Sequence, residues 1–228
     1  MECVKARNGG RPGDGGAGNH GAMPGNGCGG RSGERRRVYG WYQSLNRGEL
    51  VRLRMNIIKA KTNQYEAVRS FYHSLIDGMK GSPYAIGWEK DIYPAPDFLK
   101  DSIENGELYI CTEDNQMVGA MVLNHQCNDG YSKFQWQTEA SADEILIIHA
   151  LGVHPAHSGK GYAKAMVKKA FEVAANTSQK ALRLDVLGGN VPAERLYTGL
   201  GFRYMDTLQM YYEDTGWTDY ELYEYVLN

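Results

Sequence analysis

Hydrophobic and polar positions change period several times between residues 55 and 228, and each change marks a predicted element. Residues 56–60, "NIIKA", are typical of a strand. Residues 62–79 carry apolar side chains at helical spacing, on a helix that Thr62 is expected to cap. The inner face of this helix holds Tyr65, Val68, Phe71, Tyr72, Leu75 and Ile76. A stretch rich in Pro and aromatic residues then leads into a short helix near residues 97–105.

Strands outnumber helices in the second half of the chain. Two strands are predicted around a hairpin at residues 113–115, and residues 144–153, "EILIIHALGV", form a strand that is apolar on both faces and therefore central. A helix is expected over residues 159–174, and a strand, a short helix and two long strands that turn at residues 214–216 follow. The order β-α-α-β-β-β-α-β-α-β-β predicts an α+β fold with helices on the faces of a sheet.

Residues 1–54 differ in composition from the rest of the chain. They are rich in Gly, Pro, Asn and Arg and hold ten Lys and Arg against four Asp and Glu. Gly-Gly-Arg pieces of this kind can contact nucleic acid weakly. We favour a disordered extension, which a start codon assigned too early would also produce, and expect no nucleic-acid partner. Residues 55–228 then form one domain, whose fifteen Lys and Arg against twenty-three Asp and Glu give a net charge of −8.

Length and residue content exclude several classes of protein. The chain has 228 residues, 42% of them hydrophobic, which suits one well-cored domain. It has no run of about 18 apolar residues and no apolar signal core near its start, so no membrane span or secretion is predicted and a cytoplasmic location is the default. The four cysteines are too far apart for a zinc site or a redox pair, and we expect no metal.

A turn with two glycines, "HSGKGYA", joins the central strand to the next helix. The first N–H groups of a helix have no intrahelical partner and can bind an anion. Gly159 and Gly161 allow a ligand to approach the backbone closely, and Lys160 and Lys164 add positive charge, so a pyrophosphate would fit. By itself the Gly-Lys-Gly sequence fits equally well a tight turn that needs a positive φ.

Two common phosphate-binding motifs do not match this turn. A P-loop needs glycine where His154 stands and Ser or Thr where Gly161 stands. A dinucleotide fingerprint needs a third glycine where Lys164 stands, although Asp185 lies at a suitable distance for a ribose contact. A nucleotide-binding protein is therefore the least favoured interpretation.

Two longer patterns surround the turn. Residues 153–155 read Val-His-Pro and are followed by Ser-Gly-Lys-Gly-Tyr-Ala at residues 158–163, while residues 190–202 read Asn-x-x-Ala-x-x-Leu-Tyr-x-x-x-Gly-Phe. The first resembles the pyrophosphate loop Arg/Gln-x-x-Gly-x-Gly/Ala, and the second another motif, of the GNAT superfamily of acyl-CoA N-acyltransferases. Ser158 stands where Arg or Gln is usual, which removes one side-chain contact to phosphate and leaves the backbone N–H groups.

The resemblance covers residues 55–228 in element order and residues 144–202 in motifs. It implies a single GNAT-like domain, with a central mixed and mostly antiparallel β-sheet flanked by helices, and acetyl-CoA as co-substrate. Backbone groups of residues 151–153 would hold the oxyanion and pair with pantetheine. The implied acetyl-CoA contacts are Leu151, Gly152, Val153, Ser158, Gly159, Lys160, Gly161, Tyr162, Ala163, Lys164, Asn190, Ala193 and Tyr197.

Three residues are candidates for proton transfer. Tyr197 lies one helical turn after Ala193, and the resemblance implies that it protonates the coenzyme A sulfur. His149, on the central strand, is the preferred base, acting directly or through water, although a lone histidine on an apolar strand is commonly structural. "HALGVH" is similar to a strand of serotonin-type arylalkylamine N-acetyltransferases, whose second histidine is replaced here by Ile147, so their relay is not expected. Glu144 is the competing base.

The resemblance places the acceptor site between the first-helix region and the last hairpin. Both regions are aromatic and acidic, which suits an ammonium group, as does the net charge of the domain. The expected acceptor contacts are Tyr84, Trp88, Glu89, Tyr93, Tyr211 and Tyr212, with Asp91, Glu213 and Asp214 nearby.

The sequence therefore predicts an acetyl-CoA-dependent N-acetyltransferase that acts on a primary amine, with a small molecule as the favoured acceptor. Two alternatives stay open: an acyl-CoA-binding module without turnover, and an acetyltransferase of a protein N-terminus or lysine. A homodimer is also left open.

Overall fold

The computed structural model describes residues 55–84 and 86–227. The prediction of a disordered extension falls on residues 1–54 and lies outside the described residues. The strands are β1 (Met55–Lys59), β2 (Leu108–Glu113), β3 (Gln116–Asn124), β4 (Ile145–Val153), β5 (Ala181–Leu187), β6 (Arg203–Tyr212) and β7 (Gly216–Val226). The helices are α1 (Tyr65–Met79), α2 (Pro96–Glu104), α3 (Tyr162–Asn176) and α4 (Val191–Thr198).

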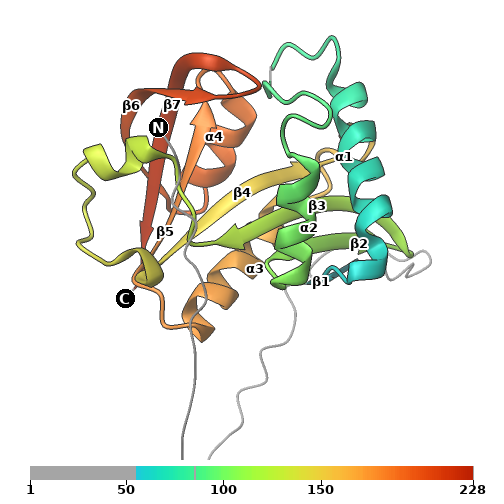
Figure 1. Cartoon of the computed structure of the whole chain (residues 1–228), viewed down its shortest axis with the longest axis horizontal. Helices are drawn as coiled ribbons and strands as arrows, with labels where there is room; N and C mark the ends of the chain where they lie inside the picture. The colour runs from blue at the N-terminus through green and yellow to red at the C-terminus, as the bar shows by residue number, and fades with distance from the viewer. Residues whose placement is uncertain (1–54, 85, 228) are drawn as a thin grey trace, which may run out of the picture. The chain divides into compact units, whose positions relative to one another are not determined.

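The seven strands of the described region form one sheet in the order β1-β2-β3-β4-β5-β7-β6 (Figure 1). Strands β4 and β5 are parallel, and the other neighbouring pairs are antiparallel. The predicted element order, the mixed and mostly antiparallel sheet and the central position of β4 are thereby confirmed.

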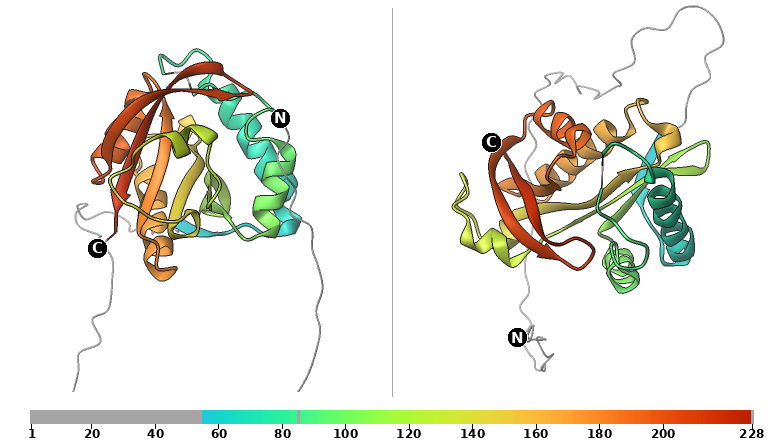
Figure 2. Two further views of the ribbon diagram at one scale, coloured as in Figure 1. Left: turned by 60° about the vertical axis from the view of Figure 1, so that its left-hand side comes forward. Right: turned by 90° about the horizontal axis from the view of Figure 1, so that it is seen from above.

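Helices cover both faces of the sheet, α1 and α2 on one and α3 and α4 on the other (Figure 2). The apolar face of α1 packs against β2, β3 and α2, where Val68, Tyr72 and Leu99 are buried. On the opposite face, Met166 and Val167 of α3 are fully buried against the sheet. These faces follow the helical spacing of apolar residues in the sequence.

Two helix starts differ from the prediction. Thr62 does not cap α1: it begins a 3-10 turn, Thr62–Gln64, in which Gln64 Oε1 accepts the Lys61 N–H at 2.9 Å. Helix α3 begins at Tyr162 rather than at residue 159, because Gly159 and Gly161 have φ angles of 77° and 86°, outside helical geometry. The turn therefore lies before the helix and not inside it.

Strand β4 bends away from β5 halfway along its length. The parallel register runs only from Ile145 opposite Ala181 to Ile147 opposite Arg183. On the other side, the register with β3 shifts near Ala150, whose φ of 48° marks a bulge. The Tyr72 hydroxyl donates to the Ala150 carbonyl at 2.9 Å and so ties the bulge to α1.

Candidate functional site

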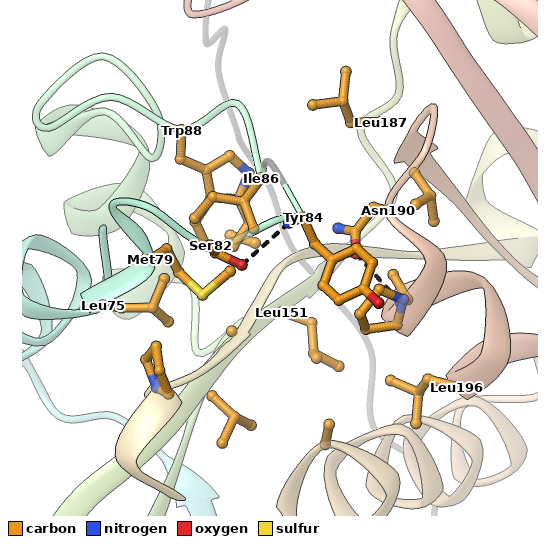
Figure 3. A pocket seen from close by; sticks show the side chains of 18 of the residues that line it. Leu75, Met79, Ser82, Tyr84, Ile86, Trp88, Leu151, Leu187, Asn190 and Leu196 are labelled. Atoms are coloured by element: carbon orange, nitrogen blue, oxygen red, sulfur yellow. Dashed lines mark hydrogen bonds between the residues drawn. The ribbon is translucent and has the colours of Figure 1, made fainter. Parts of the chain in front are cut away.

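A cavity of about 850 Å³ lies where β4 leaves β5. Its walls come from the end of α1 and the loop after it, residues 148–153 of β4, the loop before α3, the end of β5, α4 and the β6–β7 turn. We call this space the β4 cavity. In Figure 3, Trp88 and Met79 lie on one side of Leu151, and Asn190 and Leu196 lie on the other.

The bent half of β4 presents an unpaired backbone edge to the cavity. Leu151, Gly152 and Val153 all line it, and none of them pairs with β5. A Cβ on Gly152 would lie 2.5 Å from Leu75 Cδ1 and 3.2 Å from the Trp88 ring, so glycine is required for the approach of α1. Backbone N–H and C=O groups on such an edge are free to pair with an extended ligand.

The glycine turn forms an open cradle at the N-terminus of α3. Ser158, Gly159 and Gly161 line the cavity together with Lys164 of the first helical turn. No atom lies within 4 Å of a Cβ built on either glycine, so the space above the turn is open. The unpaired N–H groups of the first turn, the helix dipole and the Lys164 charge fit a pyrophosphate. Tyr162 and Ala163 complete this part of the lining.

Lys160, expected in the cradle, is not among the lining residues. Its Nζ lies 3.4 Å from Glu113 Oε2, and His157 Nδ1 lies at the same distance from that oxygen. Lys80, at the end of α1, lines the cavity and was not predicted. Lys164, in the first turn of α3, and Lys80, after α1, therefore line the cavity, and the Lys80 ammonium pairs with Asp77 at 2.8 Å.

Helix α4 brings the second motif to the cavity. Asn190 caps the helix by accepting the Ala193 N–H at 3.3 Å, and both residues line the cavity. Tyr197, one turn further on, lines it as well and is 6% exposed. Burial, and next the negative charge of Asp185, raise the pKa of the Tyr197 hydroxyl above its usual range. The hydroxyl is therefore neutral, with its proton in place, at neutral pH.

His149 lines the cavity from β4 as a neutral imidazole. Its Nε2 lies 2.8 Å from the Gln126 carbonyl, an acceptor, so Nε2 carries the hydrogen and Nδ1 has the lone pair. The Phe98 ring packs edge-on against it, with 6.1 Å between the ring centroids. Burial lowers the pKa of His149 to about 4. This geometry places the lone pair on the ring nitrogen that is free of the Gln126 contact.

The lowered pKa of His149 predicts how stability depends on pH. Its contribution to the free energy of unfolding is complete above the ordinary pKa of 6.5 and declines as pH falls toward 4, because the unfolded chain binds this proton more readily. The variant His149→Gln can still donate to Gln126 but cannot titrate. Urea unfolding across this range should show the wild type losing stability relative to the variant, and parallel curves would contradict the assignment.

Glu144 does not fit the role of competing base. It lies at the opposite end of β4 from Gly152, outside the cavity lining, and its carboxylate pairs with Lys180 Nζ at 2.8 Å. The same carboxylate accepts the Ser141 N–H and hydroxyl, both at 3.0 Å. Lys180 first, and then Ser141, lower the pKa of Glu144 to about 2. Glu144 thus stabilises the start of β4.

The predicted acceptor residues divide into two groups. Tyr84, Trp88, Tyr93 and Tyr212 line the cavity. Glu89 and Tyr211 do not. Glu89 is exposed to solvent, and Tyr211 is 53% exposed and packs on Trp217, with 5.9 Å between the ring centroids. Four of the six residues therefore form an aromatic wall of the cavity, and their contact with an acceptor stays a prediction.

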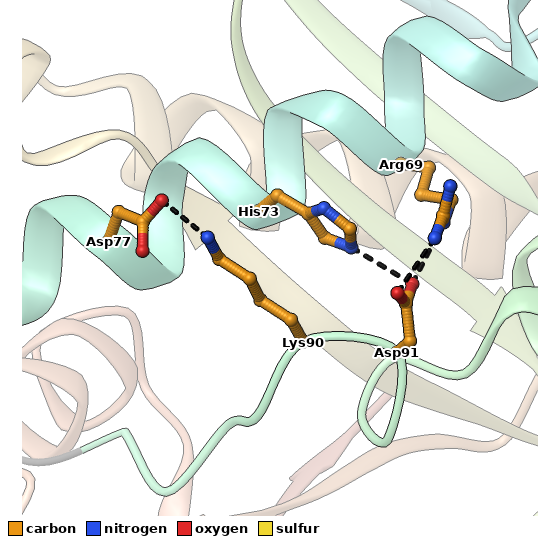
Figure 4. A network of polar contacts seen from close by, with 5 residues as sticks. All are labelled: Arg69, His73, Asp77, Lys90 and Asp91. Carbon is orange, nitrogen blue, oxygen red and sulfur yellow. Dashed lines mark hydrogen bonds and ion pairs between the residues drawn. The ribbon is translucent and has the colours of Figure 1, made fainter.

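Ion pairs hold the loop that carries Trp88 and Tyr93 against α1 (Figure 4). Asp91 accepts from Arg69 Nη2 at 2.7 Å and lies 2.9 Å from His73 Nε2. These two partners hold the pKa of Asp91 well below its usual range. The sequence analysis placed Asp91 near the acceptor site. Asp91 instead positions the aromatic wall, and it does not line the cavity.

The sequence missed the role of Asp185 in this wall. Asp185 lines the cavity from β5, and its Oδ2 accepts from the hydroxyls of Tyr131 and Tyr212, each at 2.9 Å. Burial raises the pKa of Asp185, against the two tyrosines that lower it. The strand alternation in "LRLDVL" is the one sequence signal, because it puts this carboxyl on the face opposite Leu184.

Two structural features are absent from residues 55–84 and 86–227. No group of three or more His, Cys, Asp and Glu side chains is arranged to hold a metal ion. Among the helices of these residues, none is long and apolar enough to cross a membrane.

Comparison with known proteins gives related sequences for part of the chain. The family model described as Acetyltransferase (GNAT) family matches residues 69–202, more than half of the chain. Mycothiol acetyltransferase of Kineococcus radiotolerans is 35% identical over 83 residues, which are 36% of this chain and 26% of the relative. Streptothricin acetyltransferase of Escherichia coli is 31% identical over 102 residues, 45% of this chain and 50% of the relative. The chain thus matches half or less of the length of these relatives.

Solved structures share the fold over most of their length. An acetyltransferase of the GNAT family from Streptococcus agalactiae has a TM-score of 0.63 at 16% identity, covering 76% of this chain and 96% of that one. The yncA protein of Salmonella typhimurium, solved with its cofactor acetyl-CoA, has a TM-score of 0.57 at 16% identity, covering 76% and 94%.

Proposed function

The chain belongs to the acetyltransferase (GNAT) family, and we propose that it transfers the acetyl group of acetyl-CoA to a primary amine of a small molecule. One observation carries the proposal: a single cavity joins the cradle at α3, the unpaired edge of β4 and the Tyr197 hydroxyl. A phosphate-binding turn, a strand edge for an extended ligand and a protonated phenol are the parts that thioester chemistry requires.

The lining residues fit acetyl-CoA. The cradle of Gly159, Gly161 and Lys164 would hold the pyrophosphate, and the edge of residues 151–153 would bind the pantetheine arm and the thioester oxygen. Ser158 offers a hydroxyl where the related motif has a longer side chain, so the backbone N–H groups carry more of the binding. When bound, acetyl-CoA supplies the acetyl group as an activated thioester.

Two side chains move protons in this proposal. The Tyr197 hydroxyl, which is protonated at neutral pH, gives its proton to the departing thiolate. The Nδ1 atom of His149 takes the proton that the amine must lose, directly or through one water. Because burial lowers the pKa of His149 to about 4, the ring accepts this proton only while the bond from nitrogen to carbon forms and makes the nitrogen more acidic.

We expect His149→Gln to lower kcat by about 10²-fold with little change in KM for acetyl-CoA, because general-base catalysis contributes about 10²–10⁴-fold. His125→Gln is the matched control: this histidine bonds the Ile145 carbonyl through Nδ1 at 2.7 Å and lies outside the cavity lining. Steady-state coenzyme A release measures both variants. Equal activity of His149→Gln and the control would remove His149 from the mechanism.

A small acceptor is favoured by the aromatic side chains that line that side of the cavity. Trp88 and Tyr93 pack edge to face, with 5.6 Å between their centroids, and the loop that carries them is tied to α1 by Asp91. The names of two relatives specify mycothiol and streptothricin, which are small molecules. A protein N-terminus or lysine would need an open groove at this wall.

Coenzyme A release from acetyl-CoA tests the proposal, with polyamines, arylalkylamines, amino acids, aminoglycosides and a lysine-containing peptide as acceptors. Turnover with a small amine and not with the peptide is the expected result. Binding of acetyl-CoA without turnover of any acceptor would favour the binding-module alternative, and turnover of the peptide alone would favour a protein acceptor.

A further inference from the structure

The carboxylate of Asp185 faces the β4 cavity without a cationic partner. Among the described residues, its hydrogen bonds come only from the Tyr131 and Tyr212 hydroxyls, both to Oδ2, and no ion pair includes it. Oδ1 has no donor among these residues. Asp185 is partly buried, and a carboxylate that is partly withdrawn from water without a counter-charge is stabilised by a cationic ligand.

Asp185 lies close to the proposed reaction centre. The last parallel pair is Ile147 with Arg183, so strand alternation puts His149 and Asp185 on the same face as that pair, and both residues line the cavity. The charge of Asp185 also acts on the Tyr197 hydroxyl. An amine that extends from the reaction centre toward β7 would therefore pass this carboxylate.

Charge is distributed unevenly along the cavity. Lys164 lines it at the start of α3 and Lys80, which pairs with Asp77 at 2.8 Å, lines it after α1, whereas Asp185 and Asp214 line it on the side of β5 and the β6–β7 turn. The tyrosines that line the acidic side, Tyr93, Tyr212 and Tyr220, add aromatic faces and hydroxyls. One end thus suits phosphates, and the other suits a cation between carboxylates and aromatic rings.

An ammonium group held by Asp185 would not itself be the nucleophile. An alkylammonium has a pKa of about 10.4 and a carboxyl group about 4, and the positive charge of the ammonium opposes the effect of burial on the pKa of Asp185, so the proton stays on nitrogen when the two pair. A protonated amine has no lone pair to attack a thioester. The amine that accepts the acetyl group must then be a different nitrogen from the one that Asp185 holds.

We propose that Asp185 anchors a second cationic group of the acceptor, which makes the substrate class small diamines and other amines that carry a further positive charge. The inference rests on the proposed function and narrows it to a substrate class. The free oxygen of Asp185 binds the non-reacting ammonium, Tyr131 and Tyr212 fix the orientation of the carboxylate, and Asp214 adds negative charge nearby. The free amine at the far end reaches Leu151 and His149.

The test compares diamines of three to six carbons with 1-aminoalkanes of matched length, in the full chain and its Asp185→Asn variant. An asparagine keeps an oxygen for the two tyrosine donors and removes the charge. We expect the wild type to prefer the diamines, and we expect Asp185→Asn to lower that preference by about 10- to 100-fold through KM for the diamine. The KM for the monoamines should change much less than the KM for the diamines.

Asp219→Asn is the matched control. This substitution removes the same charge from an exposed aspartate of β7 that lies outside the cavity lining. Asp185→Glu should restore part of the diamine preference, which a merely structural role would not explain. If Asp185→Asn instead lowers kcat equally for diamines and monoamines and shifts the pH profile, Asp185 accepts the reacting proton and the anchor proposal is wrong.

A binding measurement keeps this proposal separate from the proposed function. Calorimetric titration of the diamines into the chain with coenzyme A present does not require turnover. Diamine binding to the wild type that Asp185→Asn weakens would support the anchor even if no amine were acetylated. Absence of diamine binding to the wild type at every chain length would overturn it.

Discussion

Replacing Tyr197 by Phe lowers kcat for coenzyme A release by about 10²–10⁴-fold, the range of general acid–base catalysis. The phenylalanine keeps the ring, which packs edge to face on Phe202 with 5.4 Å between the centroids. Only the proton donor is lost. KM for acetyl-CoA should therefore change little, because the hydroxyl acts on the leaving group and not on ground-state binding.

Tyr223→Phe is the control for this variant. Tyr223 is also buried, packs near Tyr197 at 6.3 Å between centroids, and donates its hydroxyl to Glu221 at 2.6 Å, outside the cavity lining. It should leave kcat within a few-fold of the wild type. Similar losses in both variants would mean that the effect arises from the packing of this region and not from proton transfer.

Replacing Gly161 by Val raises the Kd for coenzyme A by about 10- to 100-fold, because one hydrogen bond to a charged group contributes about 1.5–3 kcal/mol. A Cβ at this position would enter the open space above the turn, where no protein atom lies within 4 Å. The φ of 86° also strains a side-chain-bearing residue by about 1–2 kcal/mol. Both the affinity and the stability should fall.

Gly216→Val separates these two effects. Gly216 begins β7 with a φ of 65°, its added Cβ also meets no atom within 4 Å, and it lies outside the cavity lining. This variant carries the backbone strain alone. Calorimetric titration with coenzyme A should give wild-type affinity for Gly216→Val, and an equal loss of affinity in the two variants would contradict a phosphate cradle at the start of α3.

The parts of the site that the sequence predicted are local along the chain. The cradle lies within residues 158–164, and Tyr197 lies on the short helix that Asn190 caps. Each of these parts is therefore built from residues that are close together in the sequence. The apolar residues on both faces of β4 likewise predicted its central place. The observed helix starts differ from the predicted ones by a few residues. A positive φ at Gly161 precedes one helix, and a 3-10 turn precedes the other.

The parts that the sequence did not predict depend on distant partners. The sequence offered Glu144 as the competing base. It gave no sign of the ion pair with Lys180, because Lys180 lies 36 residues away. Lys160 was expected in the cradle, but its partner Glu113 lies 47 residues earlier. The surroundings of Asp185 come from Tyr131 and Tyr212, 54 and 27 residues away, and a single sequence gives no sign of such contacts.

Acetyl transfer itself is the claim that the remaining assignments depend on. The most direct measurement incubates the full chain with acetyl-CoA and the amine panel and quantifies both products, free coenzyme A and the acetylated amine by mass spectrometry. We predict equal amounts of the two with at least one small amine, and loss of both in Tyr197→Phe. Release of coenzyme A without an acetylated amine, or at the same rate without any amine, would contradict the account.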